Sequence, residues 1–260
     1  MTQDTTNQRL DSRFRMLSII VAVTILLIAM NTFAHSPRGK AAQSSTQETG
    51  SISGKILFQG ERPKLEIIKM SNDPICESEQ KGQVYAQDGE VNENGTLPNA
   101  FVYIKDGFGT RKFTPPVNSV DLTQSGCMYQ PHVVGIMAGQ PLQVLTLDPT
   151  THNIHVTAKT NRSWNVSQQP GSPSVIRRFT DPEVMIPVHC NVHPWMKAYI
   201  GVMENPFFEV TGKDGTFDLK NIPPGEYTLA VWTATFGTQE KRVVVRAALT
   251  STADFTFGQQ

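Results

Sequence analysis

The sequence has no excess charge of either sign, and it contains few cysteines and few histidines. Lysine plus arginine and aspartate plus glutamate number 23 each, so the formal net charge is zero. This balance argues against a nucleic-acid partner, because such proteins present a basic surface. The three cysteines include no Cys-x-x-Cys-His motif, which excludes covalently attached haem.

Charged residues make up only 18% of the chain, whereas glycine (19 residues) and proline (17 residues) are frequent between short β-branched runs. This composition favours an all-β protein. The length of 260 residues leaves room for one or two domains plus a targeting segment.

Residues 1–34 contain a long apolar run. Three arginines precede it, the run extends from Met16 to Met30, and Thr32-Phe33-Ala34 supplies small residues of the kind that signal peptidase prefers. We predict an N-terminal apolar helix that is either a cleaved signal peptide or a transmembrane anchor. Both outcomes place the rest of the chain outside the cytoplasm, in the periplasm. Residues 35–50 are rich in Ser, Thr, Gln and Gly and predict a flexible linker.

The stretch 188–196 concentrates chemistry in one short loop. Cys190, His193 and Met196 lie within seven residues, with strand-like sequence on both sides. A thiolate, an imidazole and a weak thioether, joined by a second histidine, form the trigonal plus axial ligand set of a blue copper site. Val184, Ile186 and Val188 share the parity of Cys190, so we expect all of them to point inward.

The second histidine is expected at the end of another strand. His152-Asn153-Ile154-His155-Val156 offers two candidates. If His152 points inward, the apolar Ile154 and Val156 follow it, whereas an inward His155 would bury Asn153. Strand parity therefore favours His152, and we expect His155 and His189 to project from the outer sides of their strands.

The spacing Cys190-x2-His193-x2-Met196, together with the preceding His152, resembles the cupredoxins, amicyanin more closely than the plastocyanin-like members. The resemblance implies a Greek-key cupredoxin sandwich over residues 113–204, with His152, Cys190, His193 and Met196 as ligands of one copper ion. A cupredoxin-like sandwich without metal is the alternative.

The same resemblance implies roles for residues beside the ligands. Asn153 would tie the two ligand loops together by hydrogen bonds, and Pro194 and Trp195 would lie next to the metal. Trp195 either packs under the site or forms part of an apolar docking rim around His193. We favour the rim, because the loop is short and we expect His193 to face solvent.

A second unit is indicated by residues 205–258. Val210 to Leu219 and Ile222 to Leu229, with turns at Asp214-Gly215 and Pro224-Gly225, resemble the carboxypeptidase regulatory-like domain, a small transthyretin-like β-sandwich. Residues 51–112 contain two predicted strands, at 52–58 and 100–104, that could complete this sandwich around the inserted cupredoxin. Two tandem units are the simpler alternative, with the N-terminal strands belonging to the cupredoxin.

With Cys190 assigned to copper, Cys76 and Cys127 remain. An oxidising compartment favours a disulfide between them, and two separate thiols are the alternative. A metal site that combines Cys127 with the nearby His132 is a further possibility from the sequence.

These features predict an exported, mononuclear type 1 copper protein that transfers single electrons and is not an enzyme. Six histidines are too few for a multicopper oxidase. The expected partner is a redox protein such as a c-type cytochrome or a membrane electron-transfer complex. A copper-handling protein and a non-redox binding or structural module are the alternative functions.

Overall fold

The computed structural model describes residues 48–258, and this part of the chain is nearly all β. The all-β prediction is therefore confirmed. The predicted apolar helix within residues 1–34 and most of the linker at 35–50 lie outside the described residues. Strand β1 begins at Gly50, the last residue of the predicted linker. Within residues 48–258, no helix is long and apolar enough to cross a membrane.

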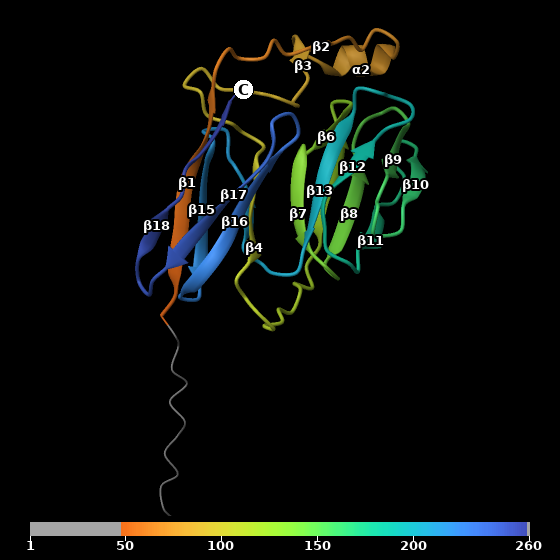
Figure 1. Cartoon of the computed structure of the whole chain (residues 1–260). Coiled ribbons are helices and arrows are strands. Elements are labelled where there is room, and N and C mark those ends of the chain that lie inside the picture. Colours follow the sequence, from red (N-terminus) through yellow and green to blue (C-terminus); the bar gives the residue numbers. More distant parts are fainter. Residues whose placement is uncertain (1–47, 259–260) are drawn as a thin grey trace, which may run out of the picture. The chain divides into compact units, whose positions relative to one another are not determined.

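The first sandwich combines strands from both ends of the described chain (Figure 1). One sheet has the order β15-β1-β18, with β19 also paired to β1, and the other has the order β14-β4-β16-β17. The strands are β1 (Gly50–Gln59), β15 (Thr216–Ile222), β18 (Thr250–Thr252), β19 (Phe255–Gly258), β14 (Phe208–Val210), β4 (Phe101–Asp106), β16 (Gly225–Thr233) and β17 (Gly237–Val245).

The two long N-terminal strands, β1 and β4, pair with strands of the C-terminal segment. β1 is antiparallel to β15 and parallel to β18 and β19, while β4 is antiparallel to β14 and β16. Their apolar side chains share one core, in which Ile52, Ile56 and Ile104 are fully buried beside Leu229 and Val231. This sandwich is therefore discontinuous in sequence, and the tandem alternative does not describe it. Its likeness to the transthyretin-like domain stays a prediction.

The second sandwich is formed by the middle of the chain. Its sheets have the orders β10-β9-β12-β13-β7 and β11-β8-β5-β6. The strands are β10 (Trp164–Gln168), β9 (His152–Val156), β12 (Glu183–His189), β13 (Lys197–Met203), β7 (Val133–Met137), β11 (Val175–Arg178), β8 (Pro141–Thr146), β5 (Val120–Ser125) and β6 (Met128–Gln130). Alternate apolar residues of the two sheets fill one core, and the candidate site lies in it.

The two sandwiches pack face to face through a separate apolar cluster. Phe101 of β4 packs there with Val133, Met185 and Met203 of the second sandwich. Gly201 in β13 allows this close approach, because a Cβ at that position would lie 2.7 Å from the Phe101 ring. Both faces of the β12–β13 sheet are therefore covered in this region.

The expectation that Val184 points inward is wrong. Its side chain is 41% exposed, whereas Ile186 and Val188 are buried as predicted. The pairing of β12 with β13 shifts register between Glu183 and Ile186, and Met185 has a φ of 59°. This bulge adds a residue to the strand and breaks the two-residue alternation on which the prediction depends.

Residues 60–99, which we call the cover, connect β1 to β4 and carry the short elements β2 (Ile67–Ile68), α2 (Pro74–Glu79) and β3 (Val84–Tyr85). In Figure 1 the cover is the orange and yellow segment above the strands. Asp73 caps α2 by accepting hydrogen bonds from the N–H groups of Ile75 (2.9 Å) and Cys76 (3.2 Å), and Pro74 follows at the first helical position. A disulfide joins Cys76 to Cys127, which fixes α2 to the second sandwich.

Candidate metal centre

Four side chains predicted as copper ligands come from the same end of the second sandwich. His152 begins β9, Cys190 directly follows β12, and His193 and Met196 lie in the loop before β13. All four are buried, with exposed fractions between 0 and 2%. The strand ends that flank the loop are held by regular pairing, from Ile186 opposite Ile200 to His189 opposite Lys197, so the loop is anchored at both ends.

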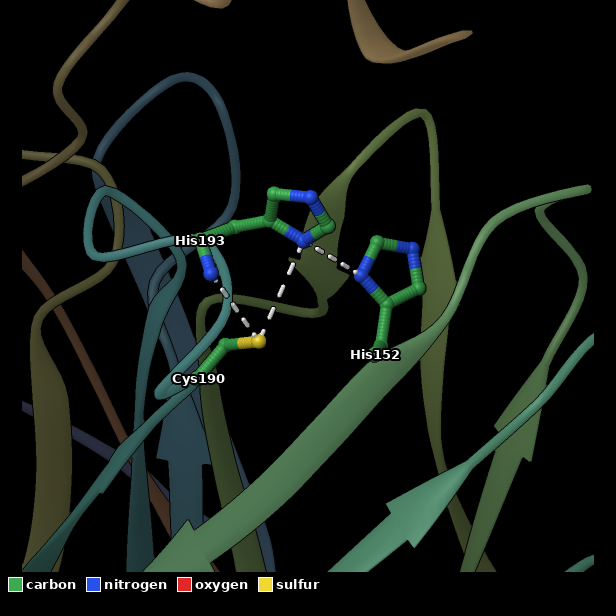
Figure 2. Close-up of side chains that lie close together, drawn as sticks. All are labelled: His152, Cys190 and His193. Carbon is green, nitrogen blue, oxygen red and sulfur yellow. Dashed lines mark hydrogen bonds between the residues drawn. The ribbon is translucent and has the colours of Figure 1, made fainter. Parts of the chain in front are cut away.

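His152, Cys190 and His193, which we call the inner cluster, point toward one another (Figure 2). The Nδ1 atoms of the two imidazoles lie 2.9 Å apart, and the Cys190 Sγ lies 3.9 Å from the His193 Nδ1. One ligand atom from each residue falls within 4.8 Å of the others. Two nitrogens and one sulfur are thus gathered around a single point.

The Cys190 sulfur also accepts hydrogen bonds from the backbone. The N–H groups of Asn153 and His193 donate to it at 3.4 and 3.3 Å. Asn153 further accepts a hydrogen bond at its Oδ1 from the N–H of Asn191. Asn153 therefore connects β9 to the 190–196 loop, as the resemblance implied. Hydrogen bonds to the sulfur stabilise a thiolate and tune any metal that it binds.

A buried carboxylate holds the His152 ring. Asp148 Oδ2 lies 2.8 Å from the His152 Nε2, and the Asp148 side chain is 3% exposed. Asp148 also accepts hydrogen bonds from the N–H groups of Gly126 (2.6 Å) and Cys127 (2.8 Å). Burial opposes ionisation of Asp148, but the His152 and backbone hydrogen bonds lower its pKa below the usual value.

A second carboxylate, from the cover, holds the His193 ring. Asp73 Oδ2 lies 2.9 Å from the His193 Nε2, and the hydroxyl of Thr150 donates to the same oxygen at 3.1 Å. The hydrogen bond from His193 lowers the pKa of Asp73 to about 2, with help from the helix N–H groups. The expectation that His193 faces solvent is wrong, because the cover leaves its side chain only 2% exposed.

These contacts determine which ring nitrogens are free. A carboxylate oxygen only accepts hydrogen bonds, so both Nε2 atoms carry hydrogens, and both Nδ1 atoms direct lone pairs into the inner cluster. The two Nδ1 atoms are 2.9 Å apart. Their lone pairs therefore repel each other unless a proton or a metal ion lies between them. The donor set, two neutral imidazoles and a buried thiolate, suits copper and also zinc.

The electrostatics of the metal-free cluster agree with this interpretation. Burial would lower the pKa of His152, but Asp148 and Cys190 raise it to about 9. Burial would raise the pKa of Cys190, but His152 and the backbone N–H groups bring it below its ordinary value. A proton on His152 would therefore lie between the two rings. Metal binding must displace this proton.

The remaining predicted site residues have different surroundings. Met196 is fully buried in the same core as Cys190, and its N–H donates to the His193 carbonyl at 2.9 Å. Pro194 is exposed and lines a groove of about 820 Å³. Trp195 also lines the groove, but its Nε1 donates to the Cys127 carbonyl at 3.0 Å and its ring packs on that of His193. Trp195 is thus a packing residue and not the rim around an exposed histidine that we expected.

The other histidines take no part in the inner cluster. His155 and His189 lie on the outer face of the sheet, as parity predicted, and both are half-buried. His132 forms hydrogen-bond contacts with Asp88 and the Lys197 carbonyl. Since Cys127 is bonded to Cys76, the prediction of a metal site built from Cys127 and His132 is wrong.

Sequence reasoning missed Asp73 and Asp148, the two residues that orient the rings. Asp73-Pro74 is a recognisable helix start, with a capping residue followed by proline. Asp148 lies four residues before His152. Neither signal shows which imidazole the carboxylate reaches.

No family description and no curated protein sequence matches the chain. Among solved structures, it is similar to a Cu-containing nitrite reductase from Thermus scotoductus SA-01, with 20% identity and a TM-score of 0.32, over 37% of this chain and 24% of that one. A purple cupredoxin from Nitrosopumilus maritimus gives 19% identity and a TM-score of 0.26, over 29% and 81% of the two chains. An amicyanin variant in the Cu(I) state gives 14% identity and a TM-score of 0.29, over 40% of this chain and 98% of that one. This chain spans only 24% of the nitrite reductase, so nothing about that enzyme's activity transfers.

Proposed function

We propose that this protein is an exported electron carrier with one type 1 copper ion bound by His152, Cys190, His193 and Met196. The observation that carries the proposal is the inner cluster, in which two imidazole Nδ1 atoms and one thiol converge and both Nε2 atoms are held by carboxylates. When bound there, copper would supply a reversible one-electron couple.

The chain's own residues keep the donor atoms in place during such a change. Asp148 and Asp73 hold the two rings, and the backbone N–H groups of Asn153 and His193 hold the Cys190 sulfur. These contacts involve groups fixed by strands, a disulfide and a helix cap. Little rearrangement is then needed when an electron arrives or leaves.

Burial of the donors favours electron transfer over substrate chemistry. The inner cluster is 0 to 2% exposed, so a substrate molecule has no direct access to a metal bound there. An electron, unlike a substrate molecule, can cross the packed protein between the cluster and the surface. Trp195 offers one such route, because its ring lies 5.0 Å from the His193 ring and also lines the groove.

The proposed setting is the periplasm, where the chain is anchored or released by its N-terminal segment. The Cys76–Cys127 disulfide supports an oxidising compartment. The proposed partner is a redox protein, such as a c-type cytochrome or a membrane electron-transfer complex.

The test is the visible spectrum after addition of one equivalent of Cu(II) to the purified full chain. An intense absorption in the red supports the electron carrier, because it reports a bond from copper to a thiolate. Bound but colourless copper would instead support a copper-handling protein. Failure to bind copper would support a non-redox module and contradict the proposal.

A further inference from the structure

Two histidines outside the inner cluster face each other across neighbouring strands. His155 of β9 and His189 of β12 are directly opposite in the antiparallel pairing. Their ring centroids are 4.3 Å apart, with a tilt of 47° between the ring planes. Both project from the outer face of the sheet, whereas Ile154 and Val188 beside them point into the core. We call them the outer pair.

The ring nitrogens of the outer pair have few protein partners. His155 Nδ1 lies 3.1 Å from the Asn191 Oδ1, an oxygen that can only accept, so Nδ1 carries the hydrogen and Nε2 a lone pair. Within residues 48–258, no protein group is hydrogen-bonded to the His155 Nε2 or to either ring nitrogen of His189. The outer pair therefore offers lone pairs from two neighbouring imidazoles.

We propose that His155 and His189 bind a second metal ion, a borderline divalent cation such as Zn²⁺ or Cu²⁺. Imidazole nitrogen is a preferred ligand for these ions. Side chains directly opposite in an antiparallel pair have Cβ atoms about 5 Å apart, so two imidazoles there can reach one ion. Asn191 orients the His155 ring as an outer hydrogen-bond partner does for ligating histidines.

The surroundings leave such a site open to solvent and to an incoming cation. Asn191 and Asn165, which flank His155, are exposed, and water would complete the coordination. Lys197 lies opposite His189 on β13, but its Nζ is 3.6 Å from an Asp88 carboxylate oxygen. The neighbouring positive charge is therefore partly offset.

The experiment is a calorimetric titration of the full chain with Zn²⁺ after the inner cluster has been filled with copper. We expect one Zn²⁺ per chain, with binding more than tenfold weaker in His155→Gln and in His189→Gln. Loss of the outer hydrogen-bond partner in Asn191→Ala should weaken binding about tenfold. Lys197→Gln alters the same face without removing an imidazole and should keep the original affinity.

The red absorption should persist in both glutamine variants, which separates the outer pair from the inner cluster. If the inner cluster does not take up copper, the same titration is made in a Cys190→Ser/His152→Ala background, so failure of the electron-carrier proposal leaves this test intact. Unchanged Zn²⁺ affinity in both glutamine variants would overturn the outer site. No Zn²⁺ binding by the unsubstituted protein would overturn it as well.

Discussion

Asp73 Oδ2 lies 2.9 Å from the Nε2 of His193, across a sequence separation of 120 residues. The other oxygen of the same carboxylate caps helix α2. One side chain thus fixes the cover to the candidate metal centre and orients a predicted ligand. Asp148, in the loop before β9, orients the His152 ring in the same way. Each imidazole of the inner cluster is therefore held by its own carboxylate.

The first prediction concerns the charge of Asp73. In Asp73→Asn the helix cap is kept, because asparagine caps as well as aspartate. Loss of the anionic partner should weaken Cu(II) binding about 10- to 100-fold. If Cu(I) binding changes less, the reduction potential rises by up to about 59 mV for each tenfold difference. Metal competition and voltammetry measure the two effects, and an unchanged potential with unchanged affinity would show that Asp73 has no influence on the metal.

The second prediction concerns the disulfide that holds α2. Replacing both Cys76 and Cys127 by serine should lower the free energy of unfolding by about 2 to 5 kcal/mol, since the unfolded chain is no longer cross-linked. Urea titration of the variant and the parent protein gives the difference. Mass analysis of unreduced peptides should find the two cysteines linked in the parent. Equal unfolding midpoints, or free thiols at both positions, would contradict the disulfide.

The third prediction is a pH dependence of stability that involves Asp88 in the cover. Burial alone would raise the pKa of Asp88, but its contacts with His132, Lys197 and Tyr199 lower it. Because the folded-state pKa is the lower one, the stabilisation is present above the unfolded-state value of about 3.9 and is lost as pH falls through the folded-state pKa.

Asp88→Asn should therefore lower stability at pH 7 and reduce the further loss of stability below about pH 4. Urea unfolding of both proteins at neutral and acidic pH measures this. Two curves with the same pH dependence would show that Asp88 does not contribute through its charge.

The fourth prediction concerns the contact between the two sandwiches. An alanine Cβ at position 201 would lie 2.7 Å from the Phe101 ring and 2.5 Å from the Met185 Cε. Gly201→Ala should lower stability by about 1 to 3 kcal/mol, because this apolar cluster has no space for a methyl group. Gly82→Ala is the matched control, since nothing lies within 4 Å of a Cβ there. If both variants unfold at the same urea concentration, Gly201 is not in close contact with Phe101 and Met185.

Sequence parity predicted β9 correctly because that strand is regular. His152, Ile154 and Val156 are fully buried, and His155 lies on the other face. The same reasoning failed at Val184, because the bulge at Met185 interrupts the alternation. A bulge is formed by the pairing with a neighbouring strand, so one strand's sequence does not reveal it.

The spacing of Cys190 and His193, together with strand parity at His152, was enough to predict the inner cluster. The surroundings of the cluster were not predictable in the same way. The cover belongs to a segment between strands of the first sandwich, and its position over His193 depends on contacts more than 100 residues apart in sequence. Exposure of His193 was predicted from its own loop, which contains no sign of the cover.

The most direct test of the electron-carrier proposal compares the copper spectra of the parent protein and Cys190→Ser. Serine is close to cysteine in volume but lacks the sulfur that gives the charge-transfer band, and circular dichroism can confirm that the variant stays folded. We predict an intense red absorption for the parent protein with one Cu(II) bound, and loss of this absorption in Cys190→Ser. The same red absorption in both proteins, or in neither, would contradict a copper site built on Cys190.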